Sequence, residues 1–154
     1  SDISSLRYGK ICILADADSD GLHIATLLCA LFLRHYKPLV QEGRIYISMP
    51  PLYRIDCGKD VLYALDNNQR DQIVEDFKNK KGKPKINIQR FKGLGEMNPP
   101  QLRETVMDPA TRQLVNLSIS PSDNVNSMMD LLLSKKNAPA RKEWLEKKGS
   151  LAKI

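Results

Sequence analysis

The sequence is poor in several features that mark particular classes of protein. Only 6% of its 154 residues are aromatic, so stacking of bases on exposed rings is not its main means of binding. The cysteines at 12, 29 and 57 are odd in number and fall outside any C-x-x-C pattern, which argues against a disulfide framework and a zinc site. We interpret them as thiols kept reduced in a cytoplasm.

Long apolar segments and several catalytic motifs are also lacking. The longest apolar run, residues 24–33, is shorter than the roughly 20 residues that a transmembrane helix needs. No signal peptide is apparent, and we expect no association with a membrane. Neither a Walker A loop nor a G-x-S-x-G elbow occurs, so ATP hydrolysis and Ser-His-Asp chemistry have no support in this chain.

Charge is the first positive signal. The net charge is +6, while the hydrophobic content of 42% is ordinary for a folded domain. A basic balance attracts polyanions over long range, which favours a nucleic acid as partner. Charge alone does not decide this, because many basic proteins bind no nucleic acid.

The hydrophobic pattern predicts an α/β fold. A short run of branched residues, a polar turn, a long helix and a second strand follow one another at the start, and this order is typical of α/β cores. We expect the first strand to be buried, parallel and central, and Pro38 to kink or end the long helix. Strands are expected at 10–15, 44–49, 53–56, 61–65, 86–91 and 114–119, and helices at 22–40, 68–80, 99–106 and from 122 onward.

Three carboxylates stand directly after the first predicted strand. Asp16, Asp18 and Asp20 occupy alternate positions, which places them on one side if the backbone stays extended. Ligands of α/β folds bind at the carboxyl ends of strands. Crowded carboxylates repel one another, and a divalent cation with a preference for hard oxygen ligands, such as Mg²⁺ or Ca²⁺, relieves that repulsion.

The same segment allows other interpretations. An EF-hand loop begins in the same way, but its twelfth position is a glutamate and here it is Leu27, so we reject it. A phosphatase with a nucleophilic aspartate and a two-metal nuclease stay open. The aspartates also suit a plain capping role at the following helix. His23, beside them, is a candidate partner of the carboxylates or of a phosphate.

A second segment, residues 89–98, combines two cations with two glycines. Gly93 and Gly95 allow close approach of the backbone to a phosphate, and Arg90 and Lys92 neutralise it. A tight turn with solvated cations is the plainer alternative. The lysines of residues 78–85 and of the C-terminal part are interpreted as solvated surface.

Taken together, residues 16–24 and 90–98 resemble the signatures of bacterial type IIA DNA topoisomerase B subunits. Residues 50–53 and 103–109 fit the same family, and the resemblance covers nearly the whole chain. Three features resemble topoisomerase IV more than DNA gyrase, which is the alternative. They are the Ser-Asp-Gly-Leu-His sequence, the Cys-Ala-Leu-Phe sequence in the predicted helix, and the small number of residues between Tyr53 and Arg90.

The resemblance implies a TOPRIM fold, which is a Rossmann-like parallel sheet flanked by helices. Residues 1–120 would form this domain without the family's first strand and its glutamate motif, and residues 121–154 would form a helical tail. It implies Mg²⁺ as cofactor, with Mn²⁺ or Ca²⁺ as substitutes. Asp16 would bridge the metal positions, Asp18 would ligate one ion, and Asp20 would contribute directly or through water.

The resemblance also implies a function. Metal held by Asp16 and Asp18 would assist DNA cleavage and religation by a tyrosine of the partner A subunit, in an ATP-dependent heterotetramer of two A and two B subunits. This enzyme would relax and decatenate DNA in the bacterial cytoplasm, at the nucleoid. ATP would bind to a region absent here, and this chain alone would be inactive. His23, Arg90 and Lys92 would contact the DNA backbone. The rivals are a free-standing magnesium phosphatase or nuclease, and a basic module that binds nucleic acid without chemistry.

Overall fold

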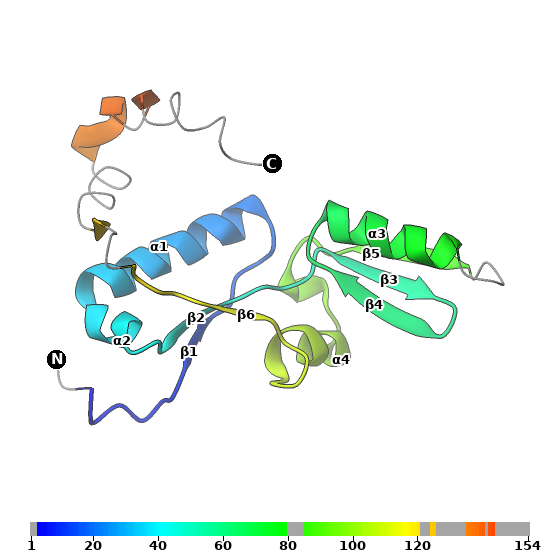
Figure 1. Cartoon of the computed structure of the whole chain (residues 1–154), viewed down its shortest axis with the longest axis horizontal. Helices are drawn as coiled ribbons and strands as arrows, with labels where there is room; N and C mark the ends of the chain where they lie inside the picture. The colour runs from blue at the N-terminus through cyan, green and yellow to red at the C-terminus, as the bar shows by residue number, and fades with distance from the viewer. Residues whose placement is uncertain (1–2, 80–84, 121–123, 126–134, 141, 144–154) are drawn as a thin grey trace.

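Two three-stranded sheets form the body of the molecule, and the first packs against two helices and the second against one (Figure 1). The computed structural model describes residues 3–79, 85–120, 124–125, 135–140 and 142–143. The strands of the first sheet, in spatial order, are β1 (Ile11–Ile13), β2 (Ile45–Ser48) and β6 (Leu114–Asn116). The strands of the second are β4 (Asp60–Ala64), β3 (Tyr53–Cys57) and β5 (Ile86–Arg90). The predicted α/β class is confirmed.

The first sheet packs against α1 (Ser19–His35) and α2 (Lys37–Gln41). Its buried cluster consists of Ile13, Ala25, Val40 and Ile45. The single helix predicted over residues 22–40 is divided at Tyr36. Pro38 stands in the first turn of α2, where its missing N–H is not needed for a helical hydrogen bond.

The prediction of a parallel sheet holds only for the pair β1–β2. β2 and β6 are antiparallel, and β3 is antiparallel to both β4 and β5. Parallel pairing needs a long crossover, and α1 with α2 supplies one between β1 and β2. A tight turn with Gly58 at a φ of 66° instead folds β4 back on β3. Among the described strands β1 pairs with β2 alone, so the prediction of a central position was wrong.

The second sheet is covered on one face by α3 (Asn67–Lys78). Alternate residues of β3 point towards this helix, and the buried cluster combines them with Ala64 and Phe77. Of the residues predicted to face inward, Phe77 is buried, Ile73 packs against the cluster and Val74 is half-buried.

The segment after β5 returns towards the first sheet. It forms the short 3₁₀ turn η1 (Leu94–Glu96), α4 (Pro99–Leu102) and the π-helical turn η2 (Arg103–Met107), where one helix over 99–106 was predicted. Asn98 starts α4 through a capping box with Gln101.

Only a small share of the C-terminal part belongs to the described residues. A 3₁₀ turn, η3 (Lys135–Asn137), is described there, and most of the predicted helical tail over 121–154 lies outside the described residues. In the part of the chain that is described, no helix has both the length and the apolar character needed to cross a bilayer.

Candidate functional site

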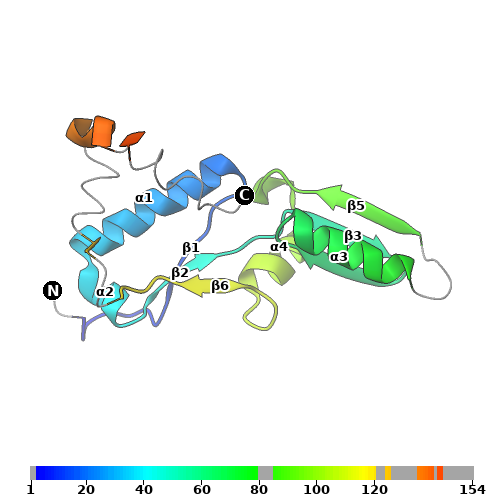
Figure 2. The ribbon, with the colours of Figure 1, turned by 45° about the horizontal axis from the view of Figure 1, so that its top comes forward.

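The fold brings the two predicted motifs into direct contact. Asp16 lies in the turn between β1 and α1, and Leu94 begins η1 in the segment after β5. The main-chain N–H of Leu94 donates to Oδ1 of Asp16 at 2.7 Å, although the two residues are 78 positions apart. Figure 2 shows the turn at the start of α1 beside the segment that follows β5.

Gly93 is required at this contact for reasons of space. A Cβ atom built on Gly93 would lie 2.9 Å from Oδ2 and 3.0 Å from Cγ of Asp16. The φ of Gly93 is −163°, an extended value that any residue adopts, so only the close approach favours glycine. A Cβ on Gly95 would meet nothing within 4 Å. A Cβ on Gly21 would lie closer still, against the main chain of Asp16.

Asp18 caps α1. Its Oδ1 accepts a hydrogen bond from the main-chain N–H of Gly21 at 2.7 Å, so the capping role left open by the sequence is present. Asp20 lies in the first turn of the same helix, where a negative charge interacts favourably with the helix dipole. Both interactions place carboxylates at the N-terminus of α1 independently of any metal.

The aspartates suit a divalent cation chemically, but they do not form a complete site by themselves. Asp16, Asp18 and Asp20 are all exposed, and each offers hard oxygen ligands. Asp16 and Asp18 each have one carboxylate hydrogen bond to another described residue, which leaves an oxygen available to a cation. Over the described ranges, no group of three or more His, Cys, Asp or Glu residues is placed to hold a metal ion. The assignment of Asp16, Asp18 and Asp20 as magnesium ligands therefore stays a prediction.

Arg90 and Lys92, the two basic residues beside the glycines, are held in place by Phe91, which lies between them in the sequence. Phe91 is 1% exposed, and its main-chain N–H donates to the carbonyl of Leu52 at 2.8 Å. Arg90 and Lys92 on either side are exposed. The main-chain N–H of Lys92 donates to Oε2 of Glu96 at 2.9 Å, which closes the turn.

His23 comes from a different element, the first part of α1, and its side chain is exposed. In the described part of the chain no ion pair engages Arg90 or Lys92, so their charges are available to a polyanion, and His23 forms no ion pair there either. No contact among these residues tests their assignment to DNA, which also stays a prediction.

Sequence reasoning missed the residues that hold the site together. The main-chain amide of Leu94 orients Asp16, and the Glu96 carboxylate fixes the turn. Gly93 was interpreted as making room for a phosphate, whereas here it makes room for the Asp16 carboxylate. The glycine pattern signalled a close approach, but it did not identify the partner.

The amino-acid sequence of the chain is similar to sequences of known proteins. The family described as "DNA gyrase B subunit, carboxyl terminus" matches residues 83–146. The DNA topoisomerase 4 B subunit of Pseudomonas aeruginosa is 62% identical over the entire chain. The chain belongs to the B-subunit family of the bacterial type IIA DNA topoisomerases.

Further members of this family support the assignment. The topoisomerase 4 B subunit of Escherichia coli is 61% identical over 99% of the chain, and the DNA gyrase B subunit of Thermotoga maritima is 45% identical over 95%. The resemblance to B subunits inferred from the two motifs is thus confirmed. The chain spans 24% of the length of each of the two topoisomerase 4 proteins and 22% of the gyrase protein.

Proposed function

We propose that this chain is the part of a topoisomerase IV B subunit that holds Mg²⁺ for cleavage and religation of DNA. The observation that carries the proposal is the hydrogen bond between Leu94 and Asp16, because it joins the acidic motif and the basic glycine motif into one surface. The identity with topoisomerase 4 B subunits over the whole chain supports the same function.

In this proposal Asp16 and Asp18 hold the cation through the carboxylate oxygens that the main chain leaves free, and Asp20 contributes directly or through water. The glutamate that the family resemblance implies lies outside this segment and would complete the ligand set. Mn²⁺ or Ca²⁺ would substitute, since both prefer oxygen ligands. A cation held there would supply stabilisation of the negative charge that develops during phosphoryl transfer.

The protein residues around the cation have separate tasks. The Leu94 amide fixes the orientation of the Asp16 carboxylate, and the Asp18 carboxylate is fixed by its bond to Gly21. Arg90 and Lys92, with His23 on the neighbouring helix, attract the DNA backbone. Such contacts are independent of sequence and weaken with salt.

The remaining parts of the reaction come from elsewhere in the assembly. A tyrosine of the A subunit attacks the phosphodiester, and two A and two B subunits form the complete enzyme, which relaxes and decatenates DNA in the bacterial cytoplasm. ATP is bound by another region of the B subunit. This segment without its partner lacks the nucleophile and should not cleave DNA.

The decisive test removes one charge while keeping the hydrogen bond. In a full-length B subunit assembled with its A subunit, Asp16→Asn retains an oxygen that accepts from Leu94 and loses the carboxylate charge. We expect magnesium-dependent DNA cleavage to be abolished, with the unfolding curve unchanged. Asp71→Asn, an exposed aspartate on α3 that pairs with Arg70, is the matched control and should cleave normally.

Two results would contradict the proposal. Full cleavage by the Asp16→Asn enzyme would favour a basic module without chemistry. Turnover of a phosphate ester by the purified chain, lost in Asp16→Asn, would favour a free-standing phosphatase or nuclease.

A further inference from the structure

A cavity of about 350 Å³ lies at the second sheet, away from the aspartates. Its size falls at the lower end of the range for small-molecule sites, roughly 300–1,000 Å³. The wall is formed by β4, by the segment that follows β2, by the segment that precedes β6, and by η2. Its apolar lining comes from Met49, Pro51, Val61 and Leu65.

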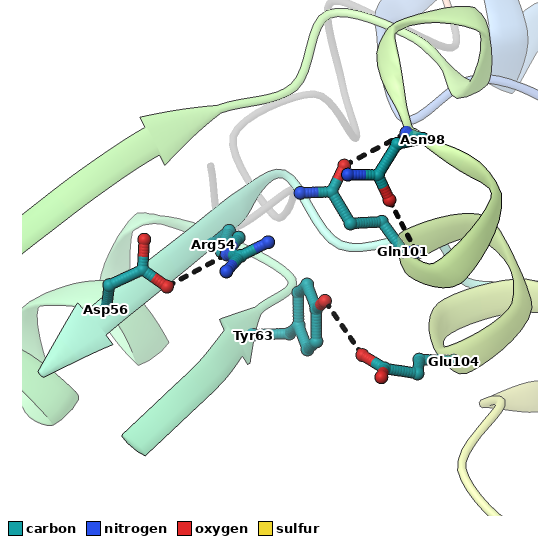
Figure 3. Close-up of polar contacts among 6 residues, drawn as sticks. All are labelled: Arg54, Asp56, Tyr63, Asn98, Gln101 and Glu104. Atoms are coloured by element: carbon teal, nitrogen blue, oxygen red, sulfur yellow. Dashed lines mark hydrogen bonds and ion pairs between the residues drawn. The ribbon is translucent and has the colours of Figure 1, made fainter. Parts of the chain in front are cut away.

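Tyr63, Glu104, Thr105, Thr111 and Gln113 form the polar part of the lining, and Glu104 is the one charged residue among the described residues that line it. The Tyr63 hydroxyl donates to Oε2 of Glu104 at 3.2 Å, a contact between β4 and η2 that Figure 3 shows. Burial and this hydrogen bond raise the pKa of Tyr63 above its usual value. The Tyr63 hydroxyl therefore stays protonated at neutral pH. It donates a hydrogen bond to the Glu104 carboxylate but carries no positive charge.

The cations near Glu104 are engaged with other carboxylates. Arg54 pairs with Asp56 at 2.9 Å, as Figure 3 shows, and Arg103 lies 3.8 Å from Asp108. None of the ion pairs among the described residues includes Glu104. The cavity thus combines an apolar wall with the Glu104 carboxylate, which forms no ion pair with a described residue, although Arg54 is near enough to attract its charge.

We propose that this cavity binds a small organic cation, with an apolar body against Met49 and Val61 and a protonated amine on Glu104. Met49 and Val61 are 39% and 44% exposed, so a ligand would remove apolar surface from water on this wall. The amine would add a charge-assisted hydrogen bond to Glu104, which is stronger than a neutral one. The proposal does not depend on the topoisomerase function, because the cavity shares no residue with the predicted metal or DNA site.

Methionine methyl NMR of the full-length B subunit tests the proposal, because Met49 reports directly from the wall. Its signal is assigned with Met49→Leu, and the subunit is titrated at neutral pH with phenethylamine or with phenethyl alcohol, a neutral ligand of similar size. We expect a saturable shift of the Met49 methyl signal. The amine should bind about tenfold more tightly than the alcohol, a difference of about 1.4 kcal/mol.

Glu104→Gln should abolish the preference for the amine, since glutamine still accepts from the Tyr63 hydroxyl but carries no charge. The matched control is Glu75→Gln on α3, which covers the opposite face of the sheet, and it should keep the preference. The proposal is overturned if Met49 does not shift, if the alcohol binds as tightly as the amine, or if Glu104→Gln retains the preference.

Discussion

Replacing Gly93 with alanine would perturb the Asp16 carboxylate without altering any charge. The new Cβ would lie 2.9 Å from Oδ2 and 3.0 Å from Oδ1 of Asp16. Non-bonded carbon contacts relax near about 3.5 Å, so the carboxylate must retreat by roughly half an ångström. Backbone conformation adds no penalty, because Gly93 is already extended. Gly95→Ala, with nothing within 4 Å, makes the same chemical change two residues away.

The displacement should affect stability little and cleavage strongly. A retreat of this size would stretch the 2.7 Å bond from Leu94 towards the limit of a hydrogen bond. A typical net contribution is about 0.5–1.5 kcal/mol, and the exposed position of Asp16 argues for the lower end. If a misplacement of 1 Å costs about 100-fold in rate, half that distance predicts a loss of about tenfold in magnesium-dependent cleavage.

The assay compares Gly93→Ala and Gly95→Ala in the full-length B subunit assembled with its A subunit, over a titration of Mg²⁺. A double-mutant cycle on the 154-residue chain then tests the cause. In an Asp16→Ala background the carboxylate is gone, so Gly93→Ala should no longer change the free energy of unfolding. The reasoning is refuted if both alanine variants cleave alike, or if the Gly93→Ala effect persists without Asp16.

Two further pairs of substitutions test the structural account. Asp18 and Asp66 both cap helices, through hydrogen bonds of 2.7 and 2.8 Å. Asparagine caps a helix about as well as aspartate, so Asp18→Asn and Asp66→Asn should both leave urea unfolding nearly unchanged. Only Asp18→Asn should lower DNA cleavage. Equal cleavage by both would contradict a metal role for Asp18. Ser48 Oγ is buried without a hydrogen bond among the described residues, so Ser48→Ala should raise the free energy of unfolding by about 1 kcal/mol. Thr105→Val should instead lower the free energy of unfolding by about 1 kcal/mol, because the buried Thr105 hydroxyl donates to the carbonyl of Gln101. If Ser48→Ala lowers the free energy of unfolding, the Ser48 hydroxyl has a hydrogen-bond partner and the prediction is wrong.

Local patterns predicted most elements, because their signals lie within a few residues. The α1 region is predictable from its apolar content and its cationic end, and α3 from its inward-facing residues. The β3–β4 hairpin is predictable from its turn at Gly58. The sheet arrangement was predicted less well, since the parallel sheet rested on the first strand–helix–strand unit, and the later strands return through short connections.

The sequence by itself determined the family and the residue types of the candidate site. Three alternate aspartates after a buried strand, and two cations around a glycine loop, are local facts that no fold is needed to see. The tertiary structure alone decided that the two motifs meet, since a hydrogen bond across 78 residues depends on the path of the whole chain. It also decided that Gly93 makes room for Asp16, and that Glu104 lies beside an apolar cavity with no ion-pair partner in the described ranges. Close approach and charge compensation depend on which surfaces pack together in the fold. Local patterns of residues along the sequence do not show which surfaces these are.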